Sequence, residues 1–372
     1  MLKKTFSIIK HVCILESGTY LFGEKIYSIC LDSKVFALPT PRELHTALPL
    51  GPAEKAFIDK SREEIQKILL GKDLRLLLII GPCSIHDLDA CLEYAEKLKG
   101  LADRVGSSCF IAMRAYMEKP RTRDGWKGLI HDPHLDESYD IEEGLLKARS
   151  FLLKLAQMRM PAATEFVTPP LAPYFADLIS WGCIGARTSS SQPHRHLAAY
   201  LPMPIGFKNS VDGNIDCAIH SAIVARSPHP FVHIDDDGRL CRTLAPGNPA
   251  AHVVLRGSQH QPNYDAETVA AVLTKLRRFE LPPRIIIDCA HDNSRKRSDK
   301  QLEVFQNVLE QIAAGNKHIC GVMLESHLEA GVQPVKASGL QRGVSITDPC
   351  IDFSTVESAL ISSSICMRLT HI

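Results

Sequence analysis

Four side chains that can bind a metal ion stand at or just beyond the carboxyl ends of apolar runs. They are Cys83, His291, Glu325 and Asp348. A single cysteine in such a place is more often a small buried hydrophobic residue than a ligand. The whole set of one thiol, one imidazole and two carboxylates could close around one divalent cation. A mixed set with an open position suits a catalytic Mn²⁺, Fe²⁺, Co²⁺ or Zn²⁺, which would polarise a carbonyl oxygen as a Lewis acid.

Cationic side chains are predicted at the same ends of these runs. They are Arg114, Lys119, Arg187, Lys208 and Arg256. Because burying an unpaired cation is costly, this group needs an anionic ligand or fixed acidic partners. Internal ion pairs with Glu165, Asp288 and Glu325 are the alternative interpretation. The segment Lys119-Pro120-Arg121-Thr122 is a second candidate anion site, since arginine and a hydroxyl group on a stiff segment suit phosphate. A metal beside two anion sites would suit two phosphorylated substrates, one of which presents a carbonyl.

The bulk composition is that of an enzyme without a charged partner surface. The chain has 372 residues, 43 basic and 42 acidic, and a net charge of +1. We therefore expect neither a nucleic-acid nor a membrane partner. Its 12 cysteines have no paired spacing, and Lys10 and His11 interrupt the apolar N-terminal stretch, which argues against a signal peptide. These features predict free thiols and a cytoplasmic location.

Apolar runs alternate with amphipathic segments after residue 75. Strands are predicted near 76–80, 109–114, 162–166, 183–187, 204–208, 252–256, 284–288 and 319–325. Segments such as 139–155 and 302–313 repeat apolar residues at spacings of three and four, which is typical of helices on a sheet. This pattern predicts an α/β fold, a closed (β/α)8 TIM barrel, with an open doubly wound sheet as the alternative. Charged residues that end nearly every strand would converge only in a closed sheet, which favours the barrel.

Three further elements are expected around this barrel. A helix at 55–71, stopped by Gly71, precedes the first strand and would cover the lower end of the barrel or contact another subunit. Asp87 is expected to cap the first barrel helix. Residues 227–251 predict a hairpin or long loop inserted before the sixth strand.

Motifs along most of the chain resemble those of the type I 3-deoxy-D-arabino-heptulosonate 7-phosphate (DAHP) synthases. They are Gly81-Pro82-Cys83-Ser84-Ile85-His86-Asp87, Lys119-Pro120-Arg121-Thr122, Gly125-Trp126-Lys127-Gly128, Gly185-Ala186-Arg187-Thr188, Gly206-Phe207-Lys208-Asn209, Leu255-Arg256-Gly257, Asp288 to Ser294, Glu325-Ser326-His327 and Ser345-Ile346-Thr347-Asp348. The resemblance implies a metal-dependent barrel that condenses phosphoenolpyruvate with erythrose 4-phosphate. This reaction opens the shikimate pathway to chorismate and the aromatic amino acids.

The resemblance also implies a role for each candidate residue. The metal ligands would be Cys83, His291, Glu325 and Asp348, with Cys83 a ligand and not a nucleophile. The phosphoenolpyruvate clamp would be Arg114, Lys119, Arg187, Lys208 and Arg256. Arg121 and Thr122 would hold erythrose 4-phosphate, and Glu165 would orient the attacking water. Lys119, Glu165 and His291 would therefore be the catalytic residues.

The chain departs from the family pattern in places that bear on regulation. Residues 1–37 do not resemble the family's N-terminus, so we expect an atypical extension followed by a barrel domain at 38–372. A proline within 200–204 and the divergent segment 227–251 alter positions near the family's effector pocket, and Ser258 replaces a usual glycine after Leu255-Arg256-Gly257. We therefore predict weak or altered feedback by an aromatic amino acid. The family also suggests a homodimer or tetramer.

Three alternative functions are less well supported by these residues. The related 3-deoxy-octulosonate 8-phosphate synthases use arabinose 5-phosphate and typically carry Lys-Ala-Asn-Arg-Ser where this chain has 119–122. A metal-dependent phosphate-ester hydrolase would explain the metal ligands but not a clamp that runs through successive strands. A non-catalytic ligand-binding barrel would not need the full set of candidate residues.

Overall fold

The computed structural model describes Cys13–Leu15, Thr19–Phe22, Lys25–Ser28 and residues 36–362 except 124 and 337. The chain divides into two compact units, Met1–Pro39 and Thr40–Ile372. The described part of the first unit is a three-stranded antiparallel sheet in the order β1-β2-β3. Its strands are β1 (Cys13–Leu15), β2 (Thr19–Phe22) and β3 (Lys25–Ser28).

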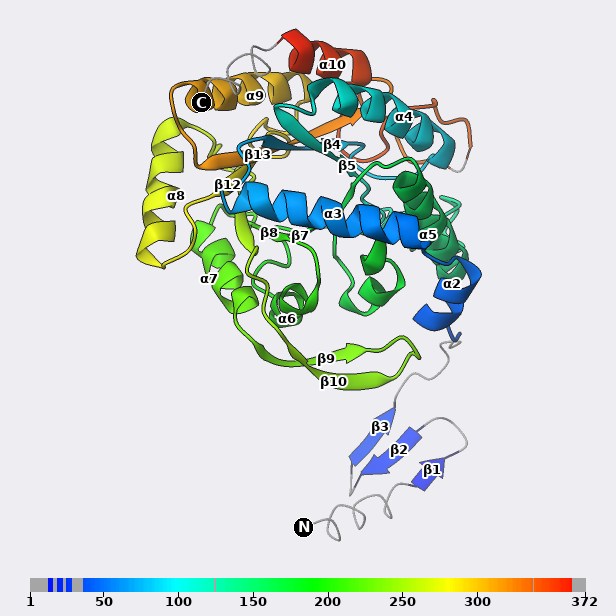
Figure 1. Ribbon diagram of the computed structural model, residues 1–372. Coiled ribbons are helices and arrows are strands. Elements are labelled where there is room, and N and C mark those ends of the chain that lie inside the picture. Colours follow the sequence, from blue (N-terminus) through cyan, green and yellow to red (C-terminus); the bar gives the residue numbers. More distant parts are fainter. Residues whose placement is uncertain are drawn as a thin grey trace. The chain divides into compact units, whose positions relative to one another are not determined.

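A closed sheet of eight parallel strands forms the centre of the second unit (Figure 1). The strands are β4 (Leu76–Gly81), β5 (Cys109–Arg114), β6 (Ala162–Glu165), β7 (Trp181–Ile184), β8 (Ile205–Lys208), β11 (His252–Leu255), β12 (Ile285–Asp288) and β13 (Ile319–His327). Each strand pairs with the next, β13 pairs with β4, and the pairing of β12 with β13 closes the barrel. The predicted TIM barrel is therefore confirmed, and the open sheet is wrong. A short strand, β14 (Ile351–Asp352), extends the pairing of β13.

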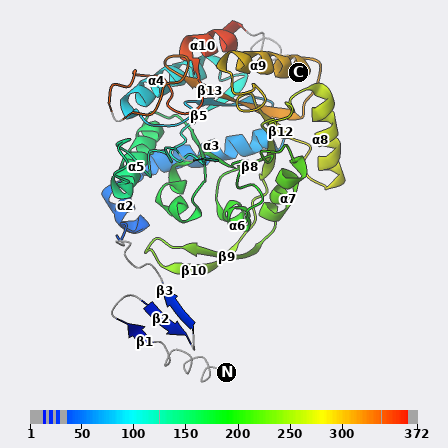
Figure 2. The ribbon, with the colours of Figure 1, turned by 180° about the vertical axis from the view of Figure 1, so that it is seen from behind.

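Helices surround these strands in both views (Figures 1 and 2). They are α2 (Pro41–Ala47), α3 (Pro52–Leu69), α4 (Leu88–Val105), α5 (Ile141–Gln157), α6 (Gln192–Tyr200), α7 (Ile215–Arg226), α8 (Ala266–Arg278), α9 (Ser298–Ala313) and α10 (Phe353–Ser362), with short 3-10 turns at Pro169–Tyr174 and Ala176–Leu178. In α8 the buried residues are Val269, Val272, Leu273 and Leu276, the face that the apolar spacing predicts. Asp87 caps α4 as expected, because its side chain accepts a hydrogen bond of 3.0 Å from the backbone N–H of Ala90.

Helix α3 fills one end of the barrel. Ile65 and Ile68 pack in one buried cluster with Leu77 and Trp181 from the barrel strands. The helix ends before Gly71, whose φ of 75° is a left-handed conformation that favours glycine. Since α3 occupies the end where the strands begin, the polar site lies at the opposite end.

The insertion before the sixth barrel strand is an antiparallel hairpin. It consists of β9 (His229–Ile234) and β10 (Leu240–Ala245), paired from Leu240 with Ile234 to Ala245 with His229. Asp235 stabilises the turn by accepting hydrogen bonds from the backbone N–H groups of Asp237 and Arg239. The predicted hairpin within 227–251 is therefore confirmed.

One predicted strand end is wrong. The strand expected at 183–187 is β7, which ends at Ile184, so that Arg187 lies in the following turn and is exposed. The strand stops early because Gly185 and the turn after it direct the chain toward α6. Among the helices that the structure describes, none has the length and apolar character needed to cross a membrane.

Candidate active site

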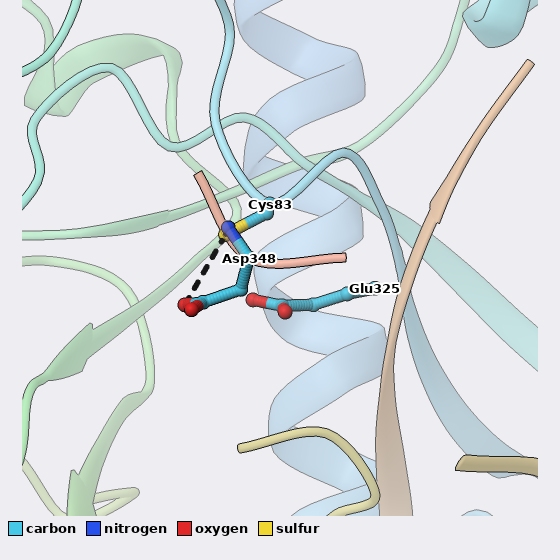
Figure 3. A group of neighbouring side chains, drawn as sticks. All are labelled: Cys83, Glu325 and Asp348. Atoms are coloured by element: carbon cyan, nitrogen blue, oxygen red, sulfur yellow. Dashed lines mark hydrogen bonds between the residues drawn. The ribbon is translucent and has the colours of Figure 1, made fainter. Parts of the chain in front are cut away.

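Three of the four candidate metal ligands lie together at the carboxyl end of the barrel (Figure 3). One donor atom from each of Cys83, Glu325 and Asp348 lies within 4.8 Å of the other two. Cys83 follows β4, and Glu325 is paired with Gly81 across the β13–β4 ladder, so the closure of the barrel brings them together. The backbone N–H of Asp348 donates to the Cys83 sulfur at 3.3 Å, which holds the third ligand against the first.

The electrostatics of this cluster favour a bound cation. Burial, followed by the negative charge of Glu325, raises the pKa of the Cys83 thiol to about 11. Burial also raises the pKa of Asp348, but the positive charges of Lys119, His291 and other groups outweigh it and hold that pKa below its ordinary value. A thiol and two carboxylates crowded into a buried site are a donor set that fits a divalent ion, which would replace the proton on sulfur.

His291 lies beside this cluster, although it is not within the group of three. Its Nε2 is 3.7 Å from Oε1 of Glu325, and its Nδ1 is 2.9 Å from Oδ2 of Asp288. The φ of His291 is 55°, a conformation that few non-glycine residues adopt and that is often found at functional sites. The imidazole therefore lies between the two carboxylates, with Nδ1 toward Asp288 and Nε2 toward Glu325.

Buried cations border the cluster and are paired with acids. Arg114 donates to Oε1 of Glu325 at 2.9 Å, and Lys208 donates to Oδ2 of Asp288 at 2.8 Å. Lys119 lies 3.1 Å from the Cys83 sulfur. Burial lowers the pKa of Lys119, but the charges of Cys83, Glu325 and other acids raise it above its ordinary value, so the ammonium persists.

The predicted internal ion pairs are therefore partly observed. Glu325 and Asp288 pair with cations as expected, but no ion pair of Glu165 occurs in the part of the chain that the structure describes. Arg256 pairs instead with Asp292, which the sequence did not suggest. The reason is that Arg256 and Asp292 follow adjacent strands, β11 and β12, and meet where those strands end.

Glu165 is buried without a partner for one of its oxygens. It is 7% exposed, and its Oε1 accepts no hydrogen bond. The space for this carboxylate exists because residue 185 is glycine: a Cβ there would lie 2.0 Å from Oε1. A buried acceptor without a donor is costly unless it serves a ligand or water, so Glu165 is suited to hold a water molecule.

The remaining candidates lie at the exposed rim of the site. Arg121, Thr122 and Arg187 are exposed, and Nε of Arg187 donates to the hydroxyl oxygen of Thr122 at 2.7 Å. This hydrogen bond joins the segment after β5 to the turn after β7. The structure thus separates the expected phosphoenolpyruvate clamp into buried cations and one exposed cation, Arg187.

A model of the DAHP synthetase I family matches residues 54–360, a span that contains every candidate residue. The chain belongs to the DAHP synthetase I family. The family expected from the motifs is confirmed, and with it the enzyme class, 3-deoxy-7-phosphoheptulonate synthase, and its place in aromatic amino-acid biosynthesis.

Curated relatives and solved structures agree with this assignment. "Phospho-2-dehydro-3-deoxyheptonate aldolase" of Corynebacterium glutamicum is 43% identical over 339 residues, which cover 89% of this chain and 92% of that protein. The Tyr-sensitive enzyme of Escherichia coli strain K12 is 45% identical over 325 residues, 87% of this chain and 91% of that protein. The solved structure of the Francisella tularensis SCHU S4 aldolase matches with a TM-score of 0.88 and 41% identity, and covers 91% of this chain and 98% of that chain.

Tyr116 is a residue of this DAHP synthetase I site that the motifs did not reveal. Its buried ring lies 3.8 Å from the Arg114 guanidinium carbon and 6.0 and 5.9 Å from the ammonium groups of Lys119 and Lys208. The face of an aromatic ring attracts cations, so the ring of Tyr116 stabilises the three neighbouring cationic side chains. The signal available in the sequence was its position two residues after Arg114, which places both side chains on the same face of an extended segment.

Proposed function

We propose that this chain condenses phosphoenolpyruvate with erythrose 4-phosphate to give DAHP and phosphate, and that the reaction depends on a divalent metal ion. The observation that carries the proposal is the position of Lys119, 3.1 Å from the Cys83 sulfur. This contact joins the candidate metal cluster to the buried cations, so an aldehyde at the metal and an anionic partner would be neighbours.

The pairing of the buried cations supports anionic substrates. Arg114 is paired with Glu325, and Lys208 is paired with Asp288. A divalent ion would compete with Arg114 for the Glu325 carboxylate. Arg114 would then donate charge-assisted hydrogen bonds to the phosphate or carboxylate of phosphoenolpyruvate.

We propose that Cys83, His291, Glu325 and Asp348 hold the metal, which would polarise the aldehyde of erythrose 4-phosphate when bound. The buried cations Arg114, Lys208 and Arg256 orient phosphoenolpyruvate so that its C3 attacks the aldehyde carbon. Lys119, next to both substrates, donates its proton to the developing alkoxide oxygen. Arg121, Thr122 and Arg187 at the rim bind phosphate groups.

The attack of C3 leaves positive character at C2 of the phosphoenolpyruvate unit. A water held by the unpartnered oxygen of Glu165 adds to C2, and Glu165 takes up the proton. The resulting hemiketal phosphate loses phosphate by cleavage of its C–O bond. The side chains supply orientation and charge stabilisation, and no covalent intermediate with the protein forms.

The test follows the loss of phosphoenolpyruvate absorbance in metal-stripped protein after addition of Mn²⁺ and one aldose phosphate. We expect consumption only with both metal and erythrose 4-phosphate. Consumption only with arabinose 5-phosphate would assign the chain to the sister reaction, and none with either would favour a non-catalytic barrel. Cys83→Ala should abolish Mn²⁺ binding and turnover, whereas Cys91→Ala, which removes a buried thiol of α4 outside the site, should preserve both.

We further propose that a cavity of about 310 Å³ beside the hairpin binds the amino-acid effector, with weak or altered feedback. Tyr200 and Phe231, with ring centroids 5.4 Å apart, supply aromatic walls, and Arg42 and Asp235 supply charges for a zwitterion. Pro202 lines this cavity and lies in the segment 200–204, where the resemblance to the family leads us to expect a small hydroxyl residue. Relatives are named Tyr-sensitive and Trp-sensitive.

Inhibition assays with phenylalanine, tyrosine and tryptophan test this proposal. Pro202→Ser should strengthen inhibition by at least one of them, because it restores a hydrogen-bonding group to the cavity. Strong inhibition of the native enzyme at low effector concentration would contradict it.

We propose that the chain forms a homodimer or tetramer through the outer face of the hairpin. Val232, Leu240 and Leu244 are 62%, 78% and 67% exposed, and the register puts them on one face. A monomer measured by light scattering would contradict this proposal.

We also propose that residues 1–37 are an extension to a synthase barrel at 38–372. The segment 38–372 should retain synthase activity when it is expressed alone.

We place the protein in the reducing cytoplasm. The cysteine side chains that the structure describes are all free thiols, which supports this location.

A further inference from the structure

The edge of β13 that faces away from β4 has a gap at Glu325. Up to Met323 this edge is paired with β12, whose last residue, Asp288, is in register with Met323. From Ser326 onward β13 is paired with β14. The carbonyl oxygen of Met323 accepts a hydrogen bond from the backbone N–H of Cys289, just beyond the end of β12. Because alternate residues of a strand form hydrogen bonds to the same side, Glu325 directs its backbone N–H and C=O to this side, beyond the last residue of β12.

The side-chain carboxamide of Gln301 fills this gap. Its Oε1 accepts a hydrogen bond of 2.9 Å from the backbone N–H of Glu325, and its Nε2 donates one of 3.2 Å to the carbonyl oxygen of the same residue. Gln301 lies in the first turns of α9 and is 1% exposed, so water does not compete for either bond. The carboxamide thus forms the two hydrogen bonds that the backbone of one residue in a neighbouring strand would otherwise form.

A related arrangement occurs beside Arg256 at the mouth of the barrel. Oδ1 of Asn209 accepts from the backbone N–H of Arg256 at 2.8 Å, and its Nδ2 donates to the carbonyl oxygen of Gly257 at 2.9 Å. In both cases a buried carboxamide satisfies backbone groups at a functional residue where the regular ladder has ended. The positions of these residues therefore depend on side chains from other elements.

We propose that Gln301 is a positioning residue for metal binding, because it fixes the backbone from which the Glu325 carboxylate extends. The proposal rests on the metal site of the proposed function. Two hydrogen bonds to one residue restrict both the position and the rotation of its peptide groups, so the carboxylate is held ready near Cys83 and Asp348. Outer groups that orient a metal ligand typically contribute about 10–100-fold to metal affinity.

Gln301→Met tests the proposal, with Gln311→Met as its matched control. Methionine keeps the length and bulk of glutamine but forms neither bond. Gln311 is a buried glutamine of the same helix, and its Nε2 donates to the carbonyl oxygen of Tyr264 at 2.7 Å, outside the site. Both variants therefore lose a buried carboxamide from α9, but only one loses the clamp on Glu325.

The readouts are the Mn²⁺ dissociation constant, measured by calorimetry on metal-stripped protein, and amide hydrogen exchange of the segment 319–327 without metal. For Gln301→Met we expect a dissociation constant raised about 10–100-fold, faster exchange at Glu325, and turnover near the native value once Mn²⁺ is saturating. For Gln311→Met we expect a dissociation constant within about twofold of the native value.

Equal dissociation constants for native protein and Gln301→Met would overturn the positioning role and leave the proposed function intact. An equal weakening in both glutamine variants would also overturn it, because the effect would then come from the packing of α9. A native protein that binds no Mn²⁺ would overturn both the metal site and the inference.

Discussion

Replacing Gly185 with alanine is expected to lower turnover about 100-fold without unfolding the protein. The added Cβ would lie 2.0 Å from Oε1 and 2.8 Å from Cδ of Glu165, whereas ordinary contacts begin at 3.4 Å. The carboxylate must therefore retreat by about 1.4 Å, and displacements of about 1 Å in a reacting group can cost about 100-fold in rate. That factor corresponds to about 2.7 kcal/mol in the activation free energy.

The fold should survive because the obstructing atoms belong to the end of one side chain and not to the backbone. Steady-state kinetics with phosphoenolpyruvate and erythrose 4-phosphate would measure kcat and KM, and thermal unfolding would check the fold. Gly100→Ala is the matched control, since a Cβ at that position of α4 meets nothing within 4 Å. It should leave kcat unchanged and, as a glycine-to-alanine change within a helix, should not destabilise the protein.

A double-mutant cycle decides whether the effect acts through Glu165. In a Glu165→Ala background the carboxylate is already absent, so Gly185→Ala should cost less than about threefold more. A further 100-fold loss in that background would refute the reasoning, because the methyl group would then act on something else. Native kcat in Gly185→Ala would refute it equally.

Three other substitutions separate buried from exposed roles. Lys208→Met should lower the free energy of unfolding by about 3–5 kcal/mol, because it leaves the buried carboxylate of Asp288 without its ammonium; a melting temperature equal to the native one would contradict this. Arg187→Met removes an exposed cation, so it should raise KM while the melting temperature stays unchanged; a lowered melting temperature with native KM would refute a binding role. Burial lowers the pKa of His252 to about 4, below an unfolded value of about 6.5. His252 is therefore neutral when folded, and the stability it contributes is present above about pH 6.5 and lost as the pH falls toward 4, by about 3 kcal/mol in all. Unfolding midpoints from pH 7 to pH 4 should fall less steeply in His252→Gln, and an unchanged slope would assign the acid sensitivity to other groups.

The family, the barrel and most residues of the candidate site could be predicted because their signals are local. Apolar runs that end in Cys83, Arg114 or Glu325 are read directly along the chain, and a parallel barrel must gather its strand ends at one mouth. Side-chain alternation then specifies which residues face inward. The hairpin and the cap at Asp87 were equally visible, since turn and cap residues act within a few positions.

The partners of those residues could not be predicted, because they depend on which distant segments the closed barrel brings together. Cys83 and Asp348 are 265 positions apart in the chain, and they become neighbours only because the segment after β13 returns to the end of β4, where the backbone N–H of Asp348 donates to the Cys83 sulfur. Arg187, expected among the buried cations, lies at the exposed rim because β7 ends at Ile184.

Two further residues illustrate the same limit. Tyr116 resembles any core aromatic residue until three cations surround its ring. Gln301 resembles any helical glutamine until the structure shows that β12 ends in register with Met323, two residues before Glu325, whose backbone groups Gln301 then pairs. The sequence by itself determined which chemical groups reach the mouth of the barrel. Tertiary structure alone decided which of them touch, because contact depends on where each strand stops and which side chain fills the space beyond it.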